Sequence, residues 1–313
     1  MARTYVDIKK FQKVMFIYNK NSGKQLFASM NSKVNEIFKH LKTFLGYKNV
    51  ELFTIQRFKE LDTLVDKAVS EKYDWVIIAG GDGTIRVVIE QLFKRNYMPY
   101  ISIVPAGTVN LVAKELLIKN DPFKWVRRIL KGVETPVYLG RCNGHVFLTC
   151  AGIGFDSLVV DNVSEIEKKL FNKMAYAWEG ADLVRREVLF KNWSYRFKVR
   201  FDGAGEWQEA SSVIVGKSRY YAGRYNLFSK AALDNPLLYV ALFKGNKRAD
   251  FASYATCIAL ESLNLNKSIE VRKARQLEII CEQGEFSVEL DGDVVTSSPL
   301  NISIEECPVK FLA

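Results

Sequence analysis

The chain has 313 residues, of which 48% are hydrophobic, so it is long enough for two compact domains and too apolar for a disordered protein. No run of about 18 apolar residues occurs, which disfavours a transmembrane helix, and we expect no signal peptide from its N-terminus. The net charge of +10 suits phosphate-rich partners such as nucleotides, nucleic acid or anionic lipid headgroups. The charges form no long block and no nucleic-acid-reading motif accompanies them, so simple solubility explains them equally well and we expect no nucleic-acid partner.

The first third of the chain alternates strand and helix patterns. Short apolar runs predict strands, and apolar residues at helical spacing predict the helices between them. In chain order the expected elements are a strand at 13–18, a helix at 24–45, a strand at 50–55, a helix at 58–70, a strand at 75–79, a helix at about 85–94 and a strand at 101–104. Apolar strands that alternate with helices indicate a parallel sheet covered on both faces, with right-handed crossovers.

From about residue 134 the pattern changes to short alternating segments separated by Gly, Asn and Asp, which is typical of an antiparallel β domain. The expected strands are 136–141, 145–150, 195–201, 212–215, 238–243, 268–272, 276–281 and 286–290. One helical stretch, at about 163–189, interrupts them. The sequence therefore predicts two domains with a boundary near residue 135.

The five cysteines are scattered and lack any CxxC spacing. Such a set is typical of reduced thiols in a cytosolic protein. Only two histidines accompany them, which argues against a zinc site. We therefore expect a cytoplasmic protein.

The sharpest local signal is the glycine-rich stretch Gly80-Gly81-Asp82-Gly83-Thr84, which follows an apolar strand and opens a helix. Glycines let the backbone approach a ligand closely, and a helix N-terminus offers unpaired N–H groups to a phosphate. The Asp82 carboxylate beside such a cradle suggests a bound Mg²⁺ or a proton acceptor. A tight strand–helix turn without a ligand is the alternative, although the carboxyl end of a central parallel strand favours a binding site.

Two further turns are expected at the same edge of the sheet. Pro105-Ala106-Gly107-Thr108-Val109-Asn110 follows the next strand, and the turn at 19–24 follows the first. Neither a GxxxxGK[ST] loop nor a GxGxxG loop after the first strand is present, which disfavours hydride transfer to a nicotinamide.

With these motifs the sequence resembles the diacylglycerol kinase catalytic-domain family of lipid kinases, which also includes sphingosine and ceramide kinases. The resemblance covers nearly the whole chain through GGDGT at 80–84, PAGTVN at 105–110, AGIGFD at 151–156, ALDNPLL at 232–238 and LDGD at 290–293. It implies an α/β fold with an N-terminal parallel-sheet nucleotide domain and a C-terminal antiparallel β-sandwich domain. The first domain would comprise 1–135 plus about 300–313, which return to it, and the lipid-substrate domain would comprise 136–299.

The resemblance also implies residue roles. The ATP-binding residues would be Asn19, Lys20, Asn21, Thr54, Gly80, Gly81, Asp82, Gly83, Thr84 and Thr108. The general base would be Asp293, which stands where the family has a longer glutamate, and a solvated turn carboxylate is the alternative reading of this residue. Asp82 is the second candidate base, or it anchors Mg²⁺ through water.

A structural Mg²⁺ is implied in the second domain, held by the Asp234 carboxylate and the backbone carbonyls of Ala231 and Pro236. Asn235 and Pro236 depart from the family pattern there. Arg86 and Val87, and also Leu111, stand where the family has acidic or amide residues. Arg86 could add positive charge to the phosphates, whereas the lost acids would weaken a metal–water network.

The sequence thus predicts an ATP- and Mg²⁺-dependent kinase acting on a lipid hydroxyl, at the membrane surface as a peripheral cytoplasmic protein. Basic and large apolar residues of 168–190 could form a helix at an anionic bilayer, or an amphipathic helix packed on the β domain. The stretch 219–224 could border a lipid cleft. An NAD kinase-like phosphotransferase and a catalytically weak nucleotide- or lipid-binding module are the alternatives. The lipid and a homodimeric state are left open.

Overall fold

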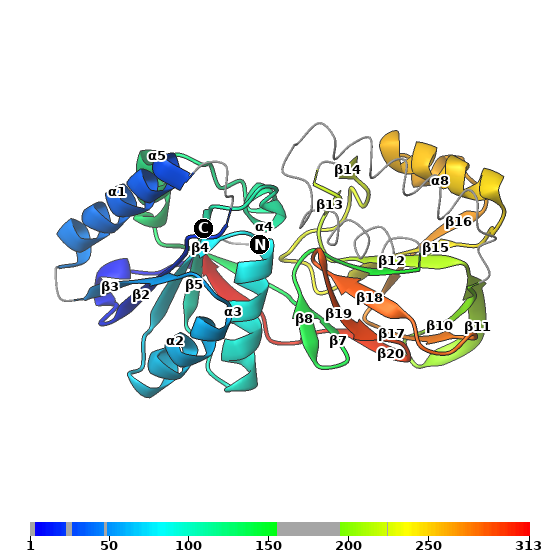
Figure 1. Cartoon of the computed structure of the whole chain (residues 1–313), viewed down its shortest axis with the longest axis horizontal. Coiled ribbons are helices and arrows are strands. Elements are labelled where there is room, and N and C mark those ends of the chain that lie inside the picture. Colours follow the sequence, from blue (N-terminus) through cyan, green and yellow to red (C-terminus); the bar gives the residue numbers. More distant parts are fainter. Residues whose placement is uncertain (1–3, 23–26, 47–48, 155–194, 224) are drawn as a thin grey trace. The chain divides into compact units, whose positions relative to one another are not determined.

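The computed structural model describes residues 4–22, 27–46, 49–154, 195–223 and 225–313 (Figure 1). The chain forms two compact units. Unit 1 comprises Met1–Tyr138 and Cys307–Ala313, and unit 2 comprises Leu139–Glu306. The predicted helix at 163–189 lies outside the described residues.

Unit 1 is built on a seven-stranded sheet of order β1-β6-β21-β5-β4-β2-β3. The strands are β1 (Thr4–Tyr5), β2 (Val14–Asn19), β3 (Val50–Ile55), β4 (Trp75–Gly80), β5 (Tyr100–Pro105), β6 (Val133–Val137) and β21 (Val309–Leu312). β21, β5, β4, β2 and β3 pair in parallel; at one edge β6 pairs antiparallel with β21, and β1 pairs antiparallel with β6. β2 and β4 are buried along their whole length, as expected for strands covered on both faces.

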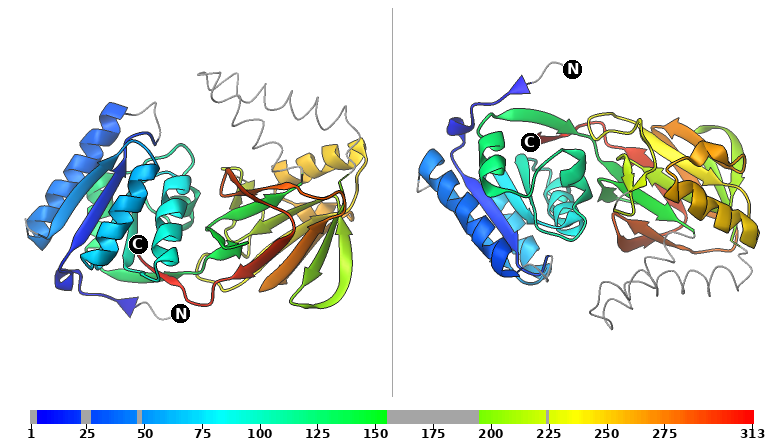
Figure 2. Two further views of the ribbon diagram at one scale, coloured as in Figure 1. Left: turned by 60° about the horizontal axis from the view of Figure 1, so that its bottom comes forward. Right: turned by 90° about the horizontal axis from the view of Figure 1, so that it is seen from above.

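Helices cover both faces of this sheet. They are α1 (Phe27–Leu45), α2 (Lys59–Ser70), α3 (Asp82–Lys94), α4 (Leu111–Glu115) and α5 (Pro122–Ile129), with a 3₁₀ turn η1 (Ile8–Lys10) before β2. α1 and α5 pack together on one face, and α2 and α3 lie on the other (Figures 1 and 2). α3 buries Ile85, Val88, Ile89 and Leu92, the spacing of a helix that packs one stripe on a sheet.

A chain of buried polar groups fixes the centre of the sheet. Trp75 Nε1 of β4 donates to Ser102 Oγ of β5 at 3.1 Å, and Ser102 Oγ donates to the carbonyl of Leu312 in β21 at 2.8 Å. Because all three strands take part, the last strand in sequence is tied to the two strands that carry the glycine-rich loops.

Unit 2 contains two six-stranded antiparallel sheets, of order β11-β10-β17-β20-β7-β8 and β16-β15-β12-β9-β18-β19. The strands of the first are β7 (Gly140–Cys142), β8 (His145–Phe147), β10 (Phe197–Phe201), β11 (Ala204–Ala210), β17 (Gln276–Cys281) and β20 (Leu300–Ile304). Those of the second are β9 (Cys150–Ile153), β12 (Ser212–Gly216), β15 (Leu238–Phe243), β16 (Ile269–Ala274), β18 (Ser287–Leu290) and β19 (Asp293–Ser297). The ring of Phe286 meets that of Phe197 at 5.3 Å and joins the two layers.

Smaller elements complete unit 2. They are the ribbon β13 (Tyr220–Tyr221) and β14 (Tyr225–Asn226), the helix α8 (Arg248–Ala259) and the 3₁₀ turn η4 (Leu263–Leu265). The sequence pattern did not predict α8, which packs the ring of Tyr254 against Phe243 of β15 at 5.0 Å. All five cysteines are free thiols. No helix in the described part of the chain is both long enough and apolar enough to cross a bilayer.

The fold class expected from the sequence is confirmed by the parallel sheet of unit 1 and the antiparallel sheets of unit 2. Two local expectations were wrong. The helix after the glycine-rich stretch begins at Asp82 rather than near residue 85, because Gly81 is extended (φ −86°, ψ 176°) and serves as its N-cap. The strands expected at 136–141 and 145–150 are each divided, the first into β6 and β7 at residues 138–139 and the second into β8 and β9 at residues 148–149; β9 then pairs with β12 and β18.

Candidate active site

Three loops leave the carboxyl ends of neighbouring strands in unit 1. β5, β4 and β2 are adjacent and parallel, with Gly80 beside Pro105 and Ala79 beside Tyr18 in the register. The loops 19–22, 80–84 and 105–110 therefore open at one edge of the sheet. We call these three loops the phosphate corner, and it is the edge where open α/β sheets bind ligands.

The first two loops are joined by side-chain hydrogen bonds. Asn19 Nδ2 donates to Thr84 Oγ1 at 2.9 Å, and the backbone N–H of Asn21 donates back to Asn19 Oδ1 at 3.0 Å. Ser22 Oγ accepts from the N–H of Gly81 at 3.3 Å and lies 3.5 Å from Thr84 Oγ1. Asn19 and Thr84 are only 6% and 3% exposed. Asn19 and Thr84, both predicted to contact ATP, are therefore buried residues that hold the loops of the phosphate corner together. Ser22 belongs to the same hydrogen-bond network although it was not among the predicted residues.

The second and third loops touch through glycine backbones. A Cβ on Gly107 would lie 2.5 Å from the Cα of Gly81, and a Cβ on Gly81 would lie 3.3 Å from the Cα of Gly107. A Cβ on Gly80 would meet the side chain of Thr84 at 2.7 Å. The corner therefore requires glycine at these positions for packing between loops.

Asp82 links the same two loops by hydrogen bonds. Its carboxylate accepts from the N–H groups of Leu111 at 2.8 Å and Val112 at 3.1 Å, at the start of α4. Asn110 precedes that helix with a positive φ of 56°, and its side chain exchanges hydrogen bonds with the backbone of Gly107 at 2.8 and 2.7 Å. Asp82 thus holds the third loop in place.

The remaining predicted ATP-binding side chains reach the solvent. Asn21, Thr54 and Thr108 are exposed and Lys20 is half-buried. Asn21 Nδ2 donates to the carbonyl of Gln56, which ties the first loop to the end of edge strand β3. These residues are available to a ligand, whereas Asn19 and Thr84 are already engaged with one another.

The N-terminus of α3 gives the corner its affinity for anions. No side chain caps this helix at Gly81, and its first intrahelical bond runs from the N–H of Ile85 to the Gly81 carbonyl. The N–H groups of the first turn and the positive end of the helix dipole point out of the helix start. A phosphate group is the ligand that this arrangement fits.

Arg86 does not add its charge to the surface of the corner. It is buried in α3, and its guanidinium pairs with Glu90 one turn later at 3.5 Å. Lys94 binds the other oxygen of Glu90 at 2.6 Å. The charge is therefore used inside unit 1, in a buried cluster with Glu90 as its centre.

In unit 2 the predicted base lies on a tight hairpin. Asp291 and Gly292 have φ values of 53° and 94°, as a two-residue turn between β18 and β19 requires, and Asp293 begins β19 as an exposed residue. The Asp291 carboxylate accepts from the N–H groups of Leu148, Thr149 and Cys150 and from the Thr149 hydroxyl, at 2.6 to 3.1 Å. Burial raises the pKa of Asp291, and these hydrogen bonds oppose that rise.

The predicted Mg²⁺-binding segment of unit 2 is contacted by the ammonium group of a lysine. Lys217 Nζ donates to the carbonyls of Ala232 at 2.7 Å and Leu233 at 3.1 Å, between the predicted ligands Ala231 and Asp234. The Asp234 side chain is exposed. Across the described ranges no group of three or more His, Cys, Asp and Glu side chains is arranged to hold a metal ion. The donor set at this segment does not fit a divalent ion.

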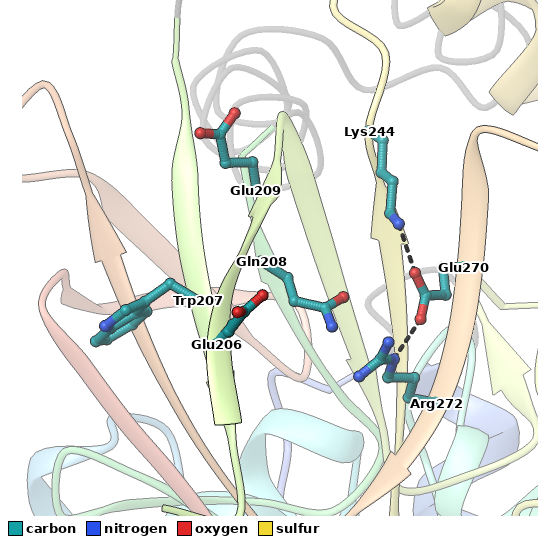
Figure 3. Close-up of a pocket in the computed structure, with 7 residues that line it drawn as sticks. All are labelled: Glu206, Trp207, Gln208, Glu209, Lys244, Glu270 and Arg272. Carbon is teal, nitrogen blue, oxygen red and sulfur yellow. Dashed lines mark hydrogen bonds and ion pairs between the residues drawn. The ribbon is translucent and has the colours of Figure 1, made fainter. Parts of the chain in front are cut away.

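A separate cavity of about 500 Å³ lies on unit 2 between the edge strands β11 and β16 (Figure 3). It is lined by Glu206, Trp207, Gln208, Glu209, Lys244, Glu270 and Arg272. Glu270 binds both Lys244 and Arg272. The lining holds three glutamates against two cations, so the cavity lacks the positive charge that a nucleotide phosphate needs.

Two known protein domains match this chain in sequence. The diacylglycerol kinase catalytic domain matches residues 13–142, and the YegS C-terminal NAD kinase beta sandwich-like domain matches residues 149–312. The two matches and the fold define the architecture of the diacylglycerol kinase type, with an α/β domain and an antiparallel β-sandwich domain. The chain belongs to the diacylglycerol kinase-like family of lipid kinases, as its motifs indicated.

The similar proteins agree along nearly their full length. A provisionally named lipid kinase of Streptococcus pneumoniae serotype 4 is 26% identical and covers 94% of this chain and 95% of its own. A diacylglycerol kinase of Staphylococcus aureus strain JH9 is 24% identical, over 93% and 89%. The structure of a provisionally named diacylglycerol kinase from Bacillus anthracis str. Sterne superposes with a TM-score of 0.77 at 23% identity, over 97% of both chains.

Proposed function

We propose that this chain is an ATP-dependent lipid kinase that transfers the γ-phosphoryl group of ATP to a lipid hydroxyl. The proposed substrates are diacylglycerol-like or sphingoid lipids. The observation that carries it is the phosphate corner, where three loops joined by Asn19, Thr84 and Asp82 surround an uncapped helix N-terminus. Backbone amides and a helix dipole are suited to polyphosphate.

The proposal gives each predicted residue a role. Amides of 81–84 hold the phosphates, and the exposed Thr54 and Thr108 contact the nucleotide. Mg²⁺, when bound with ATP, supplies charge neutralisation. Asp293 accepts the proton of the lipid hydroxyl, a role for which its exposed position at the start of β19 leaves it accessible.

We further propose peripheral contact with an anionic bilayer. The predicted helix at 168–190 lies outside the described residues, so support comes from a surface of unit 1 that we call the basic patch. It comprises exposed Lys114, Leu117, Lys119, Phe123, Lys124, Arg127 and Lys131. Leu117 and Phe123 are 73% and 63% exposed, and Leu117 has a positive φ of 56°, which is unfavourable for leucine.

Basic residues outnumber acidic ones in 111–131. Glu115 is buried, and Asp121 accepts from the N–H of Lys124 at 2.8 Å as the N-cap of α5. Arg128 donates to the carbonyls of Leu116 and Leu117, so the Leu117 turn is held beside α5. Apolar side chains projecting among cations match a surface of anionic headgroups over acyl chains.

A transfer assay tests the proposed activity. The purified full chain would be incubated with γ-labelled ATP, Mg²⁺ and detergent micelles carrying dioleoylglycerol, sphingosine, ceramide or phosphatidylglycerol, with NAD as a soluble acceptor. Label in one lipid, and its loss in Gly107→Ala, is the expected result. Label in NAD alone would make the chain an NAD kinase-like enzyme. ATP binding without transfer to any acceptor would make it a binding module.

A further inference from the structure

Lys217 places a positive charge inside unit 2. It follows β12 directly, and its side chain is fully buried with 0% exposure. Its ammonium donates to the carbonyl oxygens of Ala232 at 2.7 Å and Leu233 at 3.1 Å. Taking an ammonium group out of water is costly unless its donors are satisfied, so a lysine in this position has a specific task.

The two carbonyls belong to the segment for which the sequence predicts a structural Mg²⁺. Backbone carbonyl oxygens are hard ligands, and an ammonium group and a divalent ion use the same lone pairs on them. A fixed positive charge 2.7 Å from the Ala232 carbonyl also repels a second cation nearby. The predicted carboxylate ligand, Asp234, is exposed instead of turned into this buried cluster.

We propose that the Lys217 ammonium is the structural cation of this segment and that the chain holds residues 231–236 without a metal ion. The ammonium donates to the two carbonyls that lie between the predicted ligands Ala231 and Asp234, so a positive charge already occupies this segment. The proposal concerns the architecture of unit 2 and does not depend on which lipid, if any, is phosphorylated.

The backbone of Lys217 extends this anchor toward the hairpin of the predicted base. The N–H groups of Lys217 and Ser218 both donate to the Thr149 carbonyl, at 2.7 and 3.1 Å. The Thr149 hydroxyl in turn donates to Asp291 Oδ1 at 2.6 Å. Lys217 therefore links the carbonyls of 232–233 to Thr149, and Thr149 in turn holds the Asp291 turn that precedes Asp293. We assign Lys217 a positioning role.

Thermal unfolding of the full chain tests this assignment without any activity measurement. Wild type, Lys217→Met and Asp234→Asn would be melted in excess EDTA and in excess MgCl₂, with no nucleotide present. We expect the wild type to melt at the same temperature in both, Asp234→Asn to match it, and Lys217→Met to melt about 5 °C or more lower because two buried carbonyls lose their donor.

The metal-bound alternative makes the opposite predictions. EDTA would lower the melting temperature of the wild type, MgCl₂ would restore it, and Asp234→Asn would lose this response; any of these results overturns the proposal. If Lys217→Met does not fold, the wild type and Asp234→Asn still decide the question. Metal analysis of the desalted wild type is a second readout, in which one tightly held Mg²⁺ per chain would contradict the lysine assignment.

Discussion

Gly81 and Gly107 lie backbone to backbone, so that a Cβ on Gly107 would fall 2.5 Å from the Cα of Gly81. The reverse substitution is milder, because a Cβ on Gly81 would lie 3.3 Å from the Cα of Gly107. The two glycines come from loops after different strands, and their contact sets the width of the phosphate corner.

This asymmetry gives a graded prediction. Gly107→Ala must push the loops apart, at a cost of about 1–3 kcal/mol in stability, and we expect ATP affinity to fall about tenfold or more. Gly81→Ala serves as the matched control and should lose less stability and less ATP affinity. Calorimetric titration with ATP and thermal melts measure the two effects. Equal losses in the two variants would contradict the packing argument.

Substitution of Asp82 separates its structural role from a chemical one. Asp82→Ala removes the acceptor for the N–H groups of Leu111 and Val112 and should cost about 1–2 kcal/mol, as loss of a helix cap does. Asp82→Asn keeps an oxygen for one of these bonds and should recover part of that stability. Lipid phosphorylation by Asp82→Asn close to the wild-type rate would exclude Asp82 as the base.

Replacement of Asp293 tests the proposed general base. Asp293→Asn should lower kcat by about 100- to 10,000-fold while ATP affinity stays unchanged, because the amide that replaces the carboxylate cannot accept the hydroxyl proton. Asp293→Glu restores the family's longer carboxylate and should retain activity. The measurement is steady-state transfer to the preferred lipid, and an active Asp293→Asn would refute the assignment.

The basic patch predicts the membrane-binding behaviour of the chain. Leu117→Ser combined with Phe123→Ser removes two exposed apolar side chains, whose insertion contributes about 1.5–3 kcal/mol each when fully buried. Sedimentation with vesicles of phosphatidylglycerol and phosphatidylcholine should show binding about tenfold weaker or more, with melting unchanged. Exchange of exposed Leu260 for Ser in unit 2 is the control. Unchanged vesicle binding by the double variant would show that a different surface contacts the membrane.

Glu270 predicts one part of the pH dependence of stability. The hydrogen bond from Lys244, followed by that from Arg272, lowers the pKa of Glu270, and burial opposes the shift. A carboxyl group with a lowered folded-state pKa stabilises the protein above its unfolded pKa, and this contribution is lost as the pH falls through the folded value. As the pH falls from about 5 to about 3, the melting temperature of the wild type should therefore fall more steeply than that of Glu270→Gln. Parallel curves of melting temperature against pH would show that the ion pairs of Glu270 do not contribute to stability.

The periodicity and motifs predicted the fold class and the family, because both depend on local patterns. The apolar strand at 75–79 and the glycines after it are readable in a short window of sequence. The helix α8 was missed because its buried residues, Phe251, Tyr254 and Cys257, form a narrow stripe in an otherwise mixed segment.

The details of the site depend on contacts between distant positions. Asp82 reaches amides 29 and 30 residues away, and Thr149 reaches Asp291 across 142 residues. The sequence indicated that Asp82 was important but could not show that its carboxylate fastens a neighbouring loop. Lys217 carried no motif, and only the folded chain reveals which carbonyls its ammonium meets.

The position of β21 constrains the order in which the protein can mature on the ribosome. This strand, Val309–Leu312, lies between β5 and β6 in the sheet of unit 1, yet it is translated after all of unit 2. Unit 1 therefore cannot complete its sheet until unit 2 has already emerged. Nascent chains halted before residue 309 should expose the edges of β5 and β6 and attract chaperones that recognise unpaired strands.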